Sequence, residues 1–267
     1  MVIGFIGLGN MAKAIISGVT AGGVAAPEEI IGSDYSEAAA AAAAGALGIR
    51  TAETNNEVVR SADVIVLAVK PGVLAGVIAG IRGEDLGGKL FISIAAGKSI
   101  AYIEEQFAEK AASLHLIRYM PNTPALVQAG CTAVCPNANA TKEELETALR
   151  IAGSFGIAEV LNESLIDTES AVASCSPAYV FMFIEAMADA GVKGGLPRQQ
   201  AYRFAAQAVM GSAKLVLETG KHPGELKDMV TSPGGTTIEG LEVLEQDGFR
   251  GAVMDAIGAA IDKAKEL

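Results

Sequence analysis

The hydrophobic pattern divides the chain into two parts with different periods. Before residue 162, short apolar runs closed by glycine or proline alternate with segments that favour helix. From Leu165 onward, apolar residues recur every three or four positions and no strand signal returns. The pattern predicts an α/β domain over residues 1–162, followed by an all-helical domain over residues 163–267.

The apolar runs of the first part are expected to form a mostly parallel sheet. Continuous apolar runs are typical of strands that are buried on both faces, and helices between them favour parallel pairing. Helices are expected from Asn10, over the alanine run 38–44, and from Asn55. The expected strands are VIGFIGL (2–8), EIIGSD (29–34), DVIVLAV (63–69), LFISIAAG (90–97), a run within HLIRYMPNTPA (115–125), CTAVCP (131–136) and IAEVL (157–161).

The helical part is unusually apolar for its size. Its long helical segments are AYVFMFIEAMADAG (178–191), QQAYRFAAQAVMGSAKLVLETG (199–220) and FRGAVMDAIGAAIDKAKEL (249–267). They carry more apolar surface than a domain of about one hundred residues readily hides. We therefore expect this part to hold subunits together in a homodimer, and assembly into a larger homo-oligomer stays open.

The first expected strand runs into a glycine-rich turn. Residues Gly7 to Ala12, GLGNMA, fit the pattern G-x-G-x-x-G/A between a strand and a helix. In that pattern Gly7 permits the tight turn, Gly9 lets a pyrophosphate approach the backbone, and Ala12 lets the helix pack closely. The turn therefore predicts a dinucleotide site at a helix N-terminus, rather than a plain connection.

The second expected strand ends in Ser33 and Asp34, and Asp34 lies 22 residues after Ala12. This is close to the spacing of the carboxylate that binds the adenosine ribose in dinucleotide-binding folds. A carboxylate there favours NADH, whereas Ser33 and Ser36 are able to donate to the extra phosphate of NADPH. The cofactor is thus expected to be NADH or NADPH, and a solvated turn residue is the alternative for Asp34.

Charge and composition narrow the partners. Twenty Lys and Arg residues stand against 31 Asp and Glu residues, a net charge of −11, which disfavours nucleic-acid binding. No apolar run approaches the ~18 residues of a membrane span, and the chain enters its first strand without a secretory leader pattern. A small-molecule substrate and a cytoplasmic location are expected.

The cysteines and histidines do not form a metal-binding pattern. Cys131 and Cys135 lack a second cysteine pair, and the two histidines, His115 and His222, lie far from each other in sequence. An odd number of cysteines, with Cys175 as the third, also favours a reducing compartment. No metal site is expected.

A second glycine-rich turn lies within KDMVTSPGGTTIEGLEVLE (227–245). Ser232 to Gly235 are expected to form the turn, with Thr236 as the helix cap and Glu239 completing a capping box. Free amides at such a helix start bind small anions such as carboxylates. An ordinary capped helix is the alternative on these residues alone.

Several stretches carry a family resemblance. They are FIGLGNMA, LAVKPG (67–72), SIAAG (93–97), MPNTPA (120–125), SPAYVFMFIEAMADAGVKGGLP (176–197), QAVMGSAKLVLETG and LKDMVTSPGGTTIEGLEVLE. Through them the chain resembles the pyrroline-5-carboxylate reductases along essentially its whole length. The resemblance implies a dinucleotide-binding domain, a helical dimerisation domain, and reduction of 1-pyrroline-5-carboxylate to L-proline by NAD(P)H, the final step of proline biosynthesis.

The resemblance also implies the positions of the site residues. The cofactor is expected to contact Gly7, Leu8, Gly9, Asn10, Met11, Ser33, Asn55, Ala68, Val69, Lys70, Pro71, Ala95, Ala96 and Gly97. The substrate is expected between the Ala95 to Gly97 loop and the SPGGTT turn of a partner subunit. Expected substrate contacts are Glu163, Ser232, Gly234, Gly235, Thr236 and Thr237. A carboxylate at position 34 is unusual in the family, and it bears on the common preference for NADPH.

The reaction needs a hydride acceptor whose ring nitrogen is protonated. We expect Thr237 to be catalytic by hydrogen-bonding this nitrogen, while the substrate either binds already protonated or takes its proton from water. Among enzymes, the rival interpretations are a β-hydroxyacid dehydrogenase and a deazaflavin-dependent NADP reductase, which resemble this chain in the N-terminal half. The hydroxyacid enzymes use a catalytic lysine on a long helix of the second domain, whereas Lys193 and Lys214 here lie in segments that resemble the imine reductases. Outside enzymes, the rival interpretation is a sensor that binds the dinucleotide without chemistry.

Overall fold

The computed structural model describes residues 1–266 and shows two compact units. The first contains Met1–Ser174 together with the end of the chain from Ala264, and the second contains Cys175–Lys263. The first unit is α/β and the second is helical, which confirms the predicted fold class. The predicted domain boundary after residue 162 stays a prediction.

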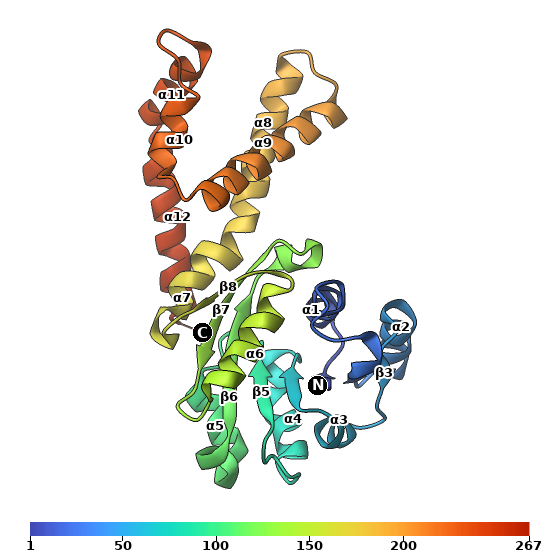
Figure 1. Cartoon of the computed structure of the whole chain (residues 1–267). Coiled ribbons are helices and arrows are strands. Elements are labelled where there is room, and N and C mark those ends of the chain that lie inside the picture. The colour runs from blue at the N-terminus through green and yellow to red at the C-terminus, as the bar shows by residue number, and fades with distance from the viewer. Residues whose placement is uncertain (267) are drawn as a thin grey trace. The chain divides into compact units, whose positions relative to one another are not determined.

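An eight-stranded sheet forms the centre of the first unit (Figure 1). The strand order is β3-β2-β1-β4-β5-β6-β7-β8, and every neighbouring pair is parallel except β6 and β7. The strands are β1 (Ile3–Ile6), β2 (Ile30–Ser33), β3 (Arg50–Thr51), β4 (Val64–Leu67), β5 (Leu90–Ser93), β6 (His115–Pro121), β7 (Gly130–Pro136) and β8 (Gly156–Val160). Each predicted strand is present. Strand β3 was not predicted, because no apolar run marks it in the sequence.

Four of the parallel strands end in line with one another. Ile6 at the end of β1 pairs with Ser33 of β2 and with Leu67 of β4, and Leu67 pairs with Ser93 of β5. The segments that follow these strands therefore leave the sheet at one edge. In parallel sheets this carboxyl edge is where ligands bind.

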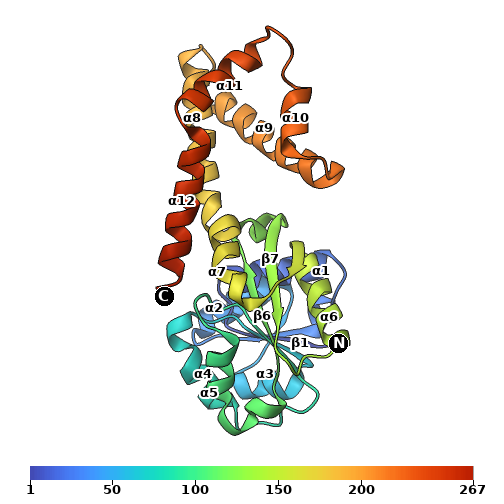
Figure 2. The same cartoon turned by 90° about the vertical axis from the view of Figure 1, so that its left-hand side faces the viewer.

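Helices cover both faces of the sheet and bury a separate apolar cluster on each. Figure 2 shows the sheet with helices on its two sides. Apolar residues of α1, α2 and α6 belong to one cluster, and those of α3, α4 and α5 belong to the other. The helices are α1 (Asn10–Ala21), α2 (Glu37–Leu47), α3 (Asn55–Ser61), α4 (Leu74–Ile81), α5 (Ile100–Phe107) and α6 (Lys142–Gly153).

Short helical turns complete the first unit. The 3-10 turns are Pro27–Glu29, Pro71–Val73, Ala108–Ser113, Thr123–Val127 and Glu163–Leu165. The four-residue helix α7 (Ile166–Glu169) is followed by a π-helical segment, Ser170–Cys175.

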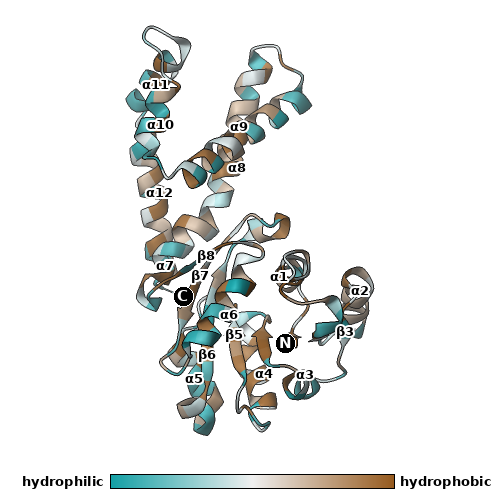
Figure 3. Ribbon diagram, viewed as in Figure 1, coloured by the Kyte–Doolittle hydropathy of each residue, from teal (hydrophilic) through white to brown (hydrophobic). Residues whose placement is uncertain are grey.

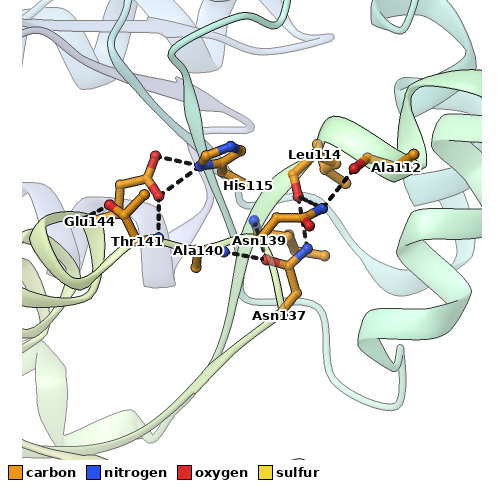
Figure 4. A network of polar contacts seen from close by, with 9 residues as sticks. Ala112, Leu114, His115, Asn137, Asn139, Ala140, Thr141 and Glu144 are labelled. Carbon is orange, nitrogen blue, oxygen red and sulfur yellow. Dashed lines mark hydrogen bonds and ion pairs between the residues drawn. The ribbon is translucent and has the colours of Figure 1, made fainter.

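A polar network fixes the start of β6 against the start of α6 (Figure 4). The Glu144 carboxylate contacts Nδ1 of His115 at 2.8 Å and accepts the N–H of Thr141, whose hydroxyl accepts the N–H of Glu144 in return. Asn137 and Asn139 donate from their side chains to the carbonyl of Leu114. Because His115 begins its strand, it lies at the edge of the sheet opposite the aligned carboxyl ends, and its role is structural.

The second unit is built from helices only. They are α8 (Ser176–Lys193), α9 (Arg198–Thr219), α10 (Pro223–Met229), α11 (Thr236–Gln246) and α12 (Phe249–Ala264). Helices α8 and α9 pack against each other, and Figure 3 shows apolar stretches along both. Many of their large apolar side chains are exposed in the single chain, among them Phe181, Met182, Phe204 and Leu217. An isolated subunit would leave this surface in water.

One helical run, Glu163–Lys193, is long and apolar enough to cross a membrane by length and composition alone, and 11% of its most apolar window is buried. Core helices of soluble proteins pass the same test, and this run contributes to the apolar surface of α8 described above.

Glu169 ends α7 with both carboxylate oxygens buried. Neither oxygen has a hydrogen-bond partner among the described residues, and burial raises the pKa of Glu169 to about 7. The folded chain therefore holds a proton at this site at pH values where an unfolded glutamate has already lost it.

This shift predicts a pH-dependent stability. Because the pKa of Glu169 is raised in the folded state, stability falls as pH rises between the unfolded value and about 7. Glu169→Gln removes the titrating group. The melting temperature of this variant, relative to that of the unsubstituted chain, should therefore rise as pH increases from about 5 to about 8. Thermal unfolding of both proteins at equal concentration, with exposed Glu28→Gln as the control, measures this. Parallel pH profiles for Glu169→Gln and the unsubstituted chain would contradict it.

Candidate cofactor and substrate sites

The turn from β1 to α1 requires glycine at position 7. Gly7 has φ +95°, and a Cβ there would lie 2.8 Å from the carbonyl oxygen of Ala68. The N–H of Gly7 donates to the carbonyl of Ser33 at 2.8 Å. The backbone of this turn is thus pressed between the ends of β2 and β4, where no side chain fits.

Helix α1 starts at this turn without a side-chain cap. Gly9 is the N-cap residue, it makes no side-chain cap hydrogen bond, and the space beside its Cα is open. By contrast, α2, α3, α5 and α6 are capped by the hydroxyls of Ser36, Thr54, Ser99 and Thr141. The start of α1 therefore presents backbone N–H groups, and the positive end of the helix dipole, to a ligand.

A cavity of about 860 Å³ opens at the aligned carboxyl ends. Eight of the residues predicted to bind the cofactor line it: Gly7, Gly9, Ser33, Asp34, Asn55, Ala68, Val69 and Lys70. They come from the segments after β1, β2 and β4 and from the start of α3. Positions as far apart in the sequence as Gly7 and Lys70 thus meet at one edge, as the parallel pairing requires.

The remaining predicted cofactor residues do not line this cavity. Leu8 points its side chain into the core, whereas Asn10 and Met11 begin α1 and Pro71 begins the turn before α4. Ala95, Ala96 and Gly97 follow β5, which is the neighbour of β4 at the same edge. Ala96 and Gly97 are exposed. A cofactor contact by these residues stays a prediction.

The end of β2 is ordered by hydrogen bonds. The Asp34 carboxylate accepts the N–H of Leu8 at 2.8 Å through Oδ2, and the N–H of Ser36 at 2.9 Å through Oδ1. The hydroxyl of Ser33 donates to Oδ1 of Asn55 at 2.8 Å. These bonds connect the glycine turn, the end of β2 and the start of α3 before any ligand binds.

The residues fit a bound nicotinamide dinucleotide. The cavity is large enough for such a ligand. Gly9 leaves room for a pyrophosphate at the helix start, and Asp34 stands where a ribose hydroxyl acceptor is needed.

Sequence reasoning missed part of the lining. Tyr35, Glu37, Glu53, Thr54, Val73 and Val77 also face the cavity. The T-N-N-E pattern from Thr54 is a helix-start signal that locates two of them, since Thr54 caps α3 and Glu53 precedes it. The others follow from the fold rather than from a motif.

The SPGGTT turn starts α11 in the same manner as the first glycine turn. Gly234 has φ +64°, the N–H of Gly235 donates to the carbonyl of Ser232, and Gly235 is the N-cap without a side-chain cap. The prediction that Thr236 caps the helix and forms a capping box with Glu239 was therefore wrong. Because the left-handed Gly234 completes the turn early, Thr236 is already the first helical residue.

Glu163 lies at a different place from the cofactor cavity. Its Oε1 accepts the N–H of Ile100 and a guanidinium N–H of Arg118, both at 2.7 Å, and Glu163 lines a separate cavity of about 520 Å³. Arg118 is almost wholly buried, so the carboxylate neutralises a buried cation. A contact with substrate stays a prediction for Glu163.

Among residues 1–266, no group of three or more His, Cys, Asp and Glu side chains is placed to hold a metal ion. His222 is the N-cap of α10, where its Nδ1 accepts the N–H of Gly224 at 3.0 Å.

The doubly wound sheet, the glycine turn and the cavity define a dinucleotide-binding protein of the Rossmann class. Residues 2–97 match the family model of the coenzyme F420-dependent NADP oxidoreductases, and residues 163–267 match that of the pyrroline-5-carboxylate reductase dimerisation domain. The pyrroline-5-carboxylate reductase of Escherichia coli (strain K12) is 51% identical over 265 residues, which cover 99% of this chain and 97% of that protein. The chain belongs to the pyrroline-5-carboxylate reductase family and is an NAD(P)H-dependent oxidoreductase.

Solved structures agree with this assignment. A pyrroline-5-carboxylate reductase from Coxiella burnetii has a TM-score of 0.92 and 34% identity, covering 99% of this chain and 97% of that chain. A Plasmodium falciparum pyrroline carboxylate reductase with NADP bound has a TM-score of 0.85 and 34% identity, covering 100% and 97%. The predicted family is confirmed.

The two glycines of the first turn predict separable effects. Gly7→Ala should lower the free energy of unfolding by about 1–3 kcal/mol, because it forces a Cβ against the Ala68 carbonyl at positive φ. Gly9→Ala should lower this free energy by less than about 1 kcal/mol, because alanine is a poorer N-cap than glycine. It should also weaken dinucleotide binding, because its new methyl group enters the cavity. Chemical denaturation and calorimetric titration with NAD⁺ measure the two effects. Equal stabilities for the two variants would contradict this account of the turn.

Proposed function

We propose that the chain reduces the cyclic imine of 1-pyrroline-5-carboxylate to L-proline at a site built by two subunits. The cavity of one subunit holds the cofactor, and the SPGGTT turn of the partner subunit holds the substrate. When bound, the reduced nicotinamide supplies the hydride. The strongest support is that both glycine turns start helices without side-chain caps, so each leaves backbone amides free for an anion.

The cofactor is held mainly by backbone and small polar groups. Gly9 and the first amides of α1 bind the pyrophosphate, and Ser33, Asp34 and Asn55 contact the adenosine half. Lys70, exposed after β4, is placed to contribute charge on the other side of the glycine turn. Orientation is the main contribution of these residues, since the hydride chemistry belongs to the cofactor.

The substrate carboxylate is held at the start of α11. Its partners are the first N–H groups of the helix and the hydroxyls of Ser232 and Thr236, which are exposed in the single chain. A Cβ at position 235 would lie 2.4 Å from the Ser232 hydroxyl oxygen, so glycine there leaves this hydroxyl in its present position. A site of amides and hydroxyls binds a carboxylate without a counter-charge of its own.

Thr237 is the proposed catalytic residue. Its hydroxyl hydrogen-bonds the ring nitrogen of the imine and so positions the ring for hydride attack at the adjacent carbon. The proton on this nitrogen comes with the substrate or from water. Neither histidine is placed for this role, since His115 pairs with Glu144 at the opposite edge of the sheet and the His222 ring caps α10.

The helical unit provides the subunit contact. The match of residues 163–267 to a dimerisation domain and the exposed apolar side chains of α8 and α9 both support a homodimer. The buried apolar area would then include the apolar run that ends at Lys193. Assembly into a larger homo-oligomer and a cytoplasmic location, in line with the three free cysteines, belong to this proposal.

The role of Thr237 is tested by removing its hydroxyl at nearly constant shape. Thr237→Val should lower kcat for 1-pyrroline-5-carboxylate by about tenfold to a hundredfold, because the ring nitrogen loses a hydrogen-bond partner in a desolvated site. Thr237→Ser keeps the hydroxyl and should retain most of the activity. Calorimetric titration with NAD⁺ should give the same Kd for both variants. An unchanged kcat in Thr237→Val would rule out this role.

A further inference from the structure

We infer that the acidic end of the cofactor cavity, with Asp34 as its main determinant, makes this chain select NADH over NADPH. This rests on the proposed use of the cavity and goes beyond the family assignment, which is compatible with either cofactor. The two cofactors differ by one phosphate on the adenosine ribose, so the charge at that end of the cavity decides between them.

Asp34 is held in a fixed orientation as a hydrogen-bond acceptor. One carboxylate oxygen accepts the N–H of Leu8 within the glycine turn, and the other accepts the N–H of Ser36. Both bonds orient the carboxylate at the end of β2. Its remaining lone pairs are available to the two hydroxyls of an unphosphorylated ribose.

Two further carboxylates flank this position. Glu37 begins α2 just after Asp34, and Glu53 follows β3, the strand that pairs with β2. Both line the same cavity, and both are exposed in the single chain. A ribose phosphate at the end of β2 would therefore approach three negative groups.

The cavity provides no cation close enough to offset them. Among the described residues that line it, Lys70 is the only cationic one. Lys70 follows β4, and β1 separates β4 from β2 in the sheet. Two strand spacings amount to about 10 Å, so the backbone of Lys70 stands about that far from the end of β2, whereas Asp34 follows β2 directly. Adding the phosphate thus brings repulsion without a compensating ion pair.

Calorimetric titration of the full-length protein with NAD⁺ and NADP⁺ tests the cofactor preference by binding alone, with no imine substrate present. NAD⁺ should bind at least about tenfold more tightly than NADP⁺ at low salt, because the extra phosphate is brought close to like charges. Equal affinity, tighter binding of NADP⁺, or no binding of either dinucleotide would overturn the inference. Since no imine is present, failure of the proposed reduction would leave this result unaffected.

Variants separate charge from shape. Asp34→Asn keeps the size of the side chain and removes its charge, so it should reduce the NAD⁺ preference by about tenfold. Glu37→Gln with Glu53→Gln leaves the Asp34 hydrogen bonds intact and should tighten NADP⁺ binding several-fold, even if Asp34→Asn impairs folding. Glu28→Gln, an exposed position outside the cavity, is the matched control and should change neither affinity. If the double variant bound NADP⁺ no better than the control does, the inference that carboxylates at this end of the cavity select the cofactor would be wrong.

Discussion

The backbone turn at Gly7 is the constraint on which the rest of the first unit depends. At this point β1 must pass into α1 while the carbonyl of Ala68 stands 2.8 Å from where a Cβ would be, and the turn N–H bonds the end of β2. Three strand ends therefore meet at this backbone junction. The cavity exists because nothing larger than glycine occupies this junction.

The two glycine turns show how this fold keeps helix starts available for ligands. A Ser, Thr, Asp or Asn cap typically stabilises a helix by about 1 kcal/mol over an apolar residue, whereas glycine itself costs only a few tenths. Helices α2 and α6 have hydroxyl caps, from Ser36 and Thr141. Helices α1 and α11 instead begin at Gly9 and Gly235, so their first amides stay free for a phosphate or a carboxylate.

Much of the fold could be read from the sequence because its signals are local. Each buried parallel strand is an uninterrupted apolar run, and the glycine turn has fixed spacing. The two-residue strand β3 could not be predicted, because Arg50 and Thr51 are exposed and polar and the strand is recognisable only by its pairing with β2. The start of α11 was misplaced by one residue because sequence alone did not show that Gly234 adopts positive φ.

The motif residues of the site could be predicted from the sequence, but the way the fold brings them together with other residues could not. Motif residues at strand ends converge because parallel strands end in line, yet Glu37 and Glu53 enter the cavity only through the tertiary path of the chain. The function of Glu163 cannot be inferred from its sequence position, and the structure gives it a structural partner in Arg118. In the proposed site the substrate half comes from a second subunit, whose contacts no single-chain pattern contains.

Subunit complementation tests most directly whether two subunits build each site. Gly9→Asp, which places a carboxylate at the pyrophosphate position, and Thr237→Val are expressed separately and together, and loss of reduced-nicotinamide absorbance is followed with 1-pyrroline-5-carboxylate. If each site takes its cavity from one subunit and its turn from the partner, mixed dimers contain one intact site. Co-expression should then restore activity to about a quarter of that of the unsubstituted enzyme. Activity no higher than the average of the two single variants would contradict a shared site.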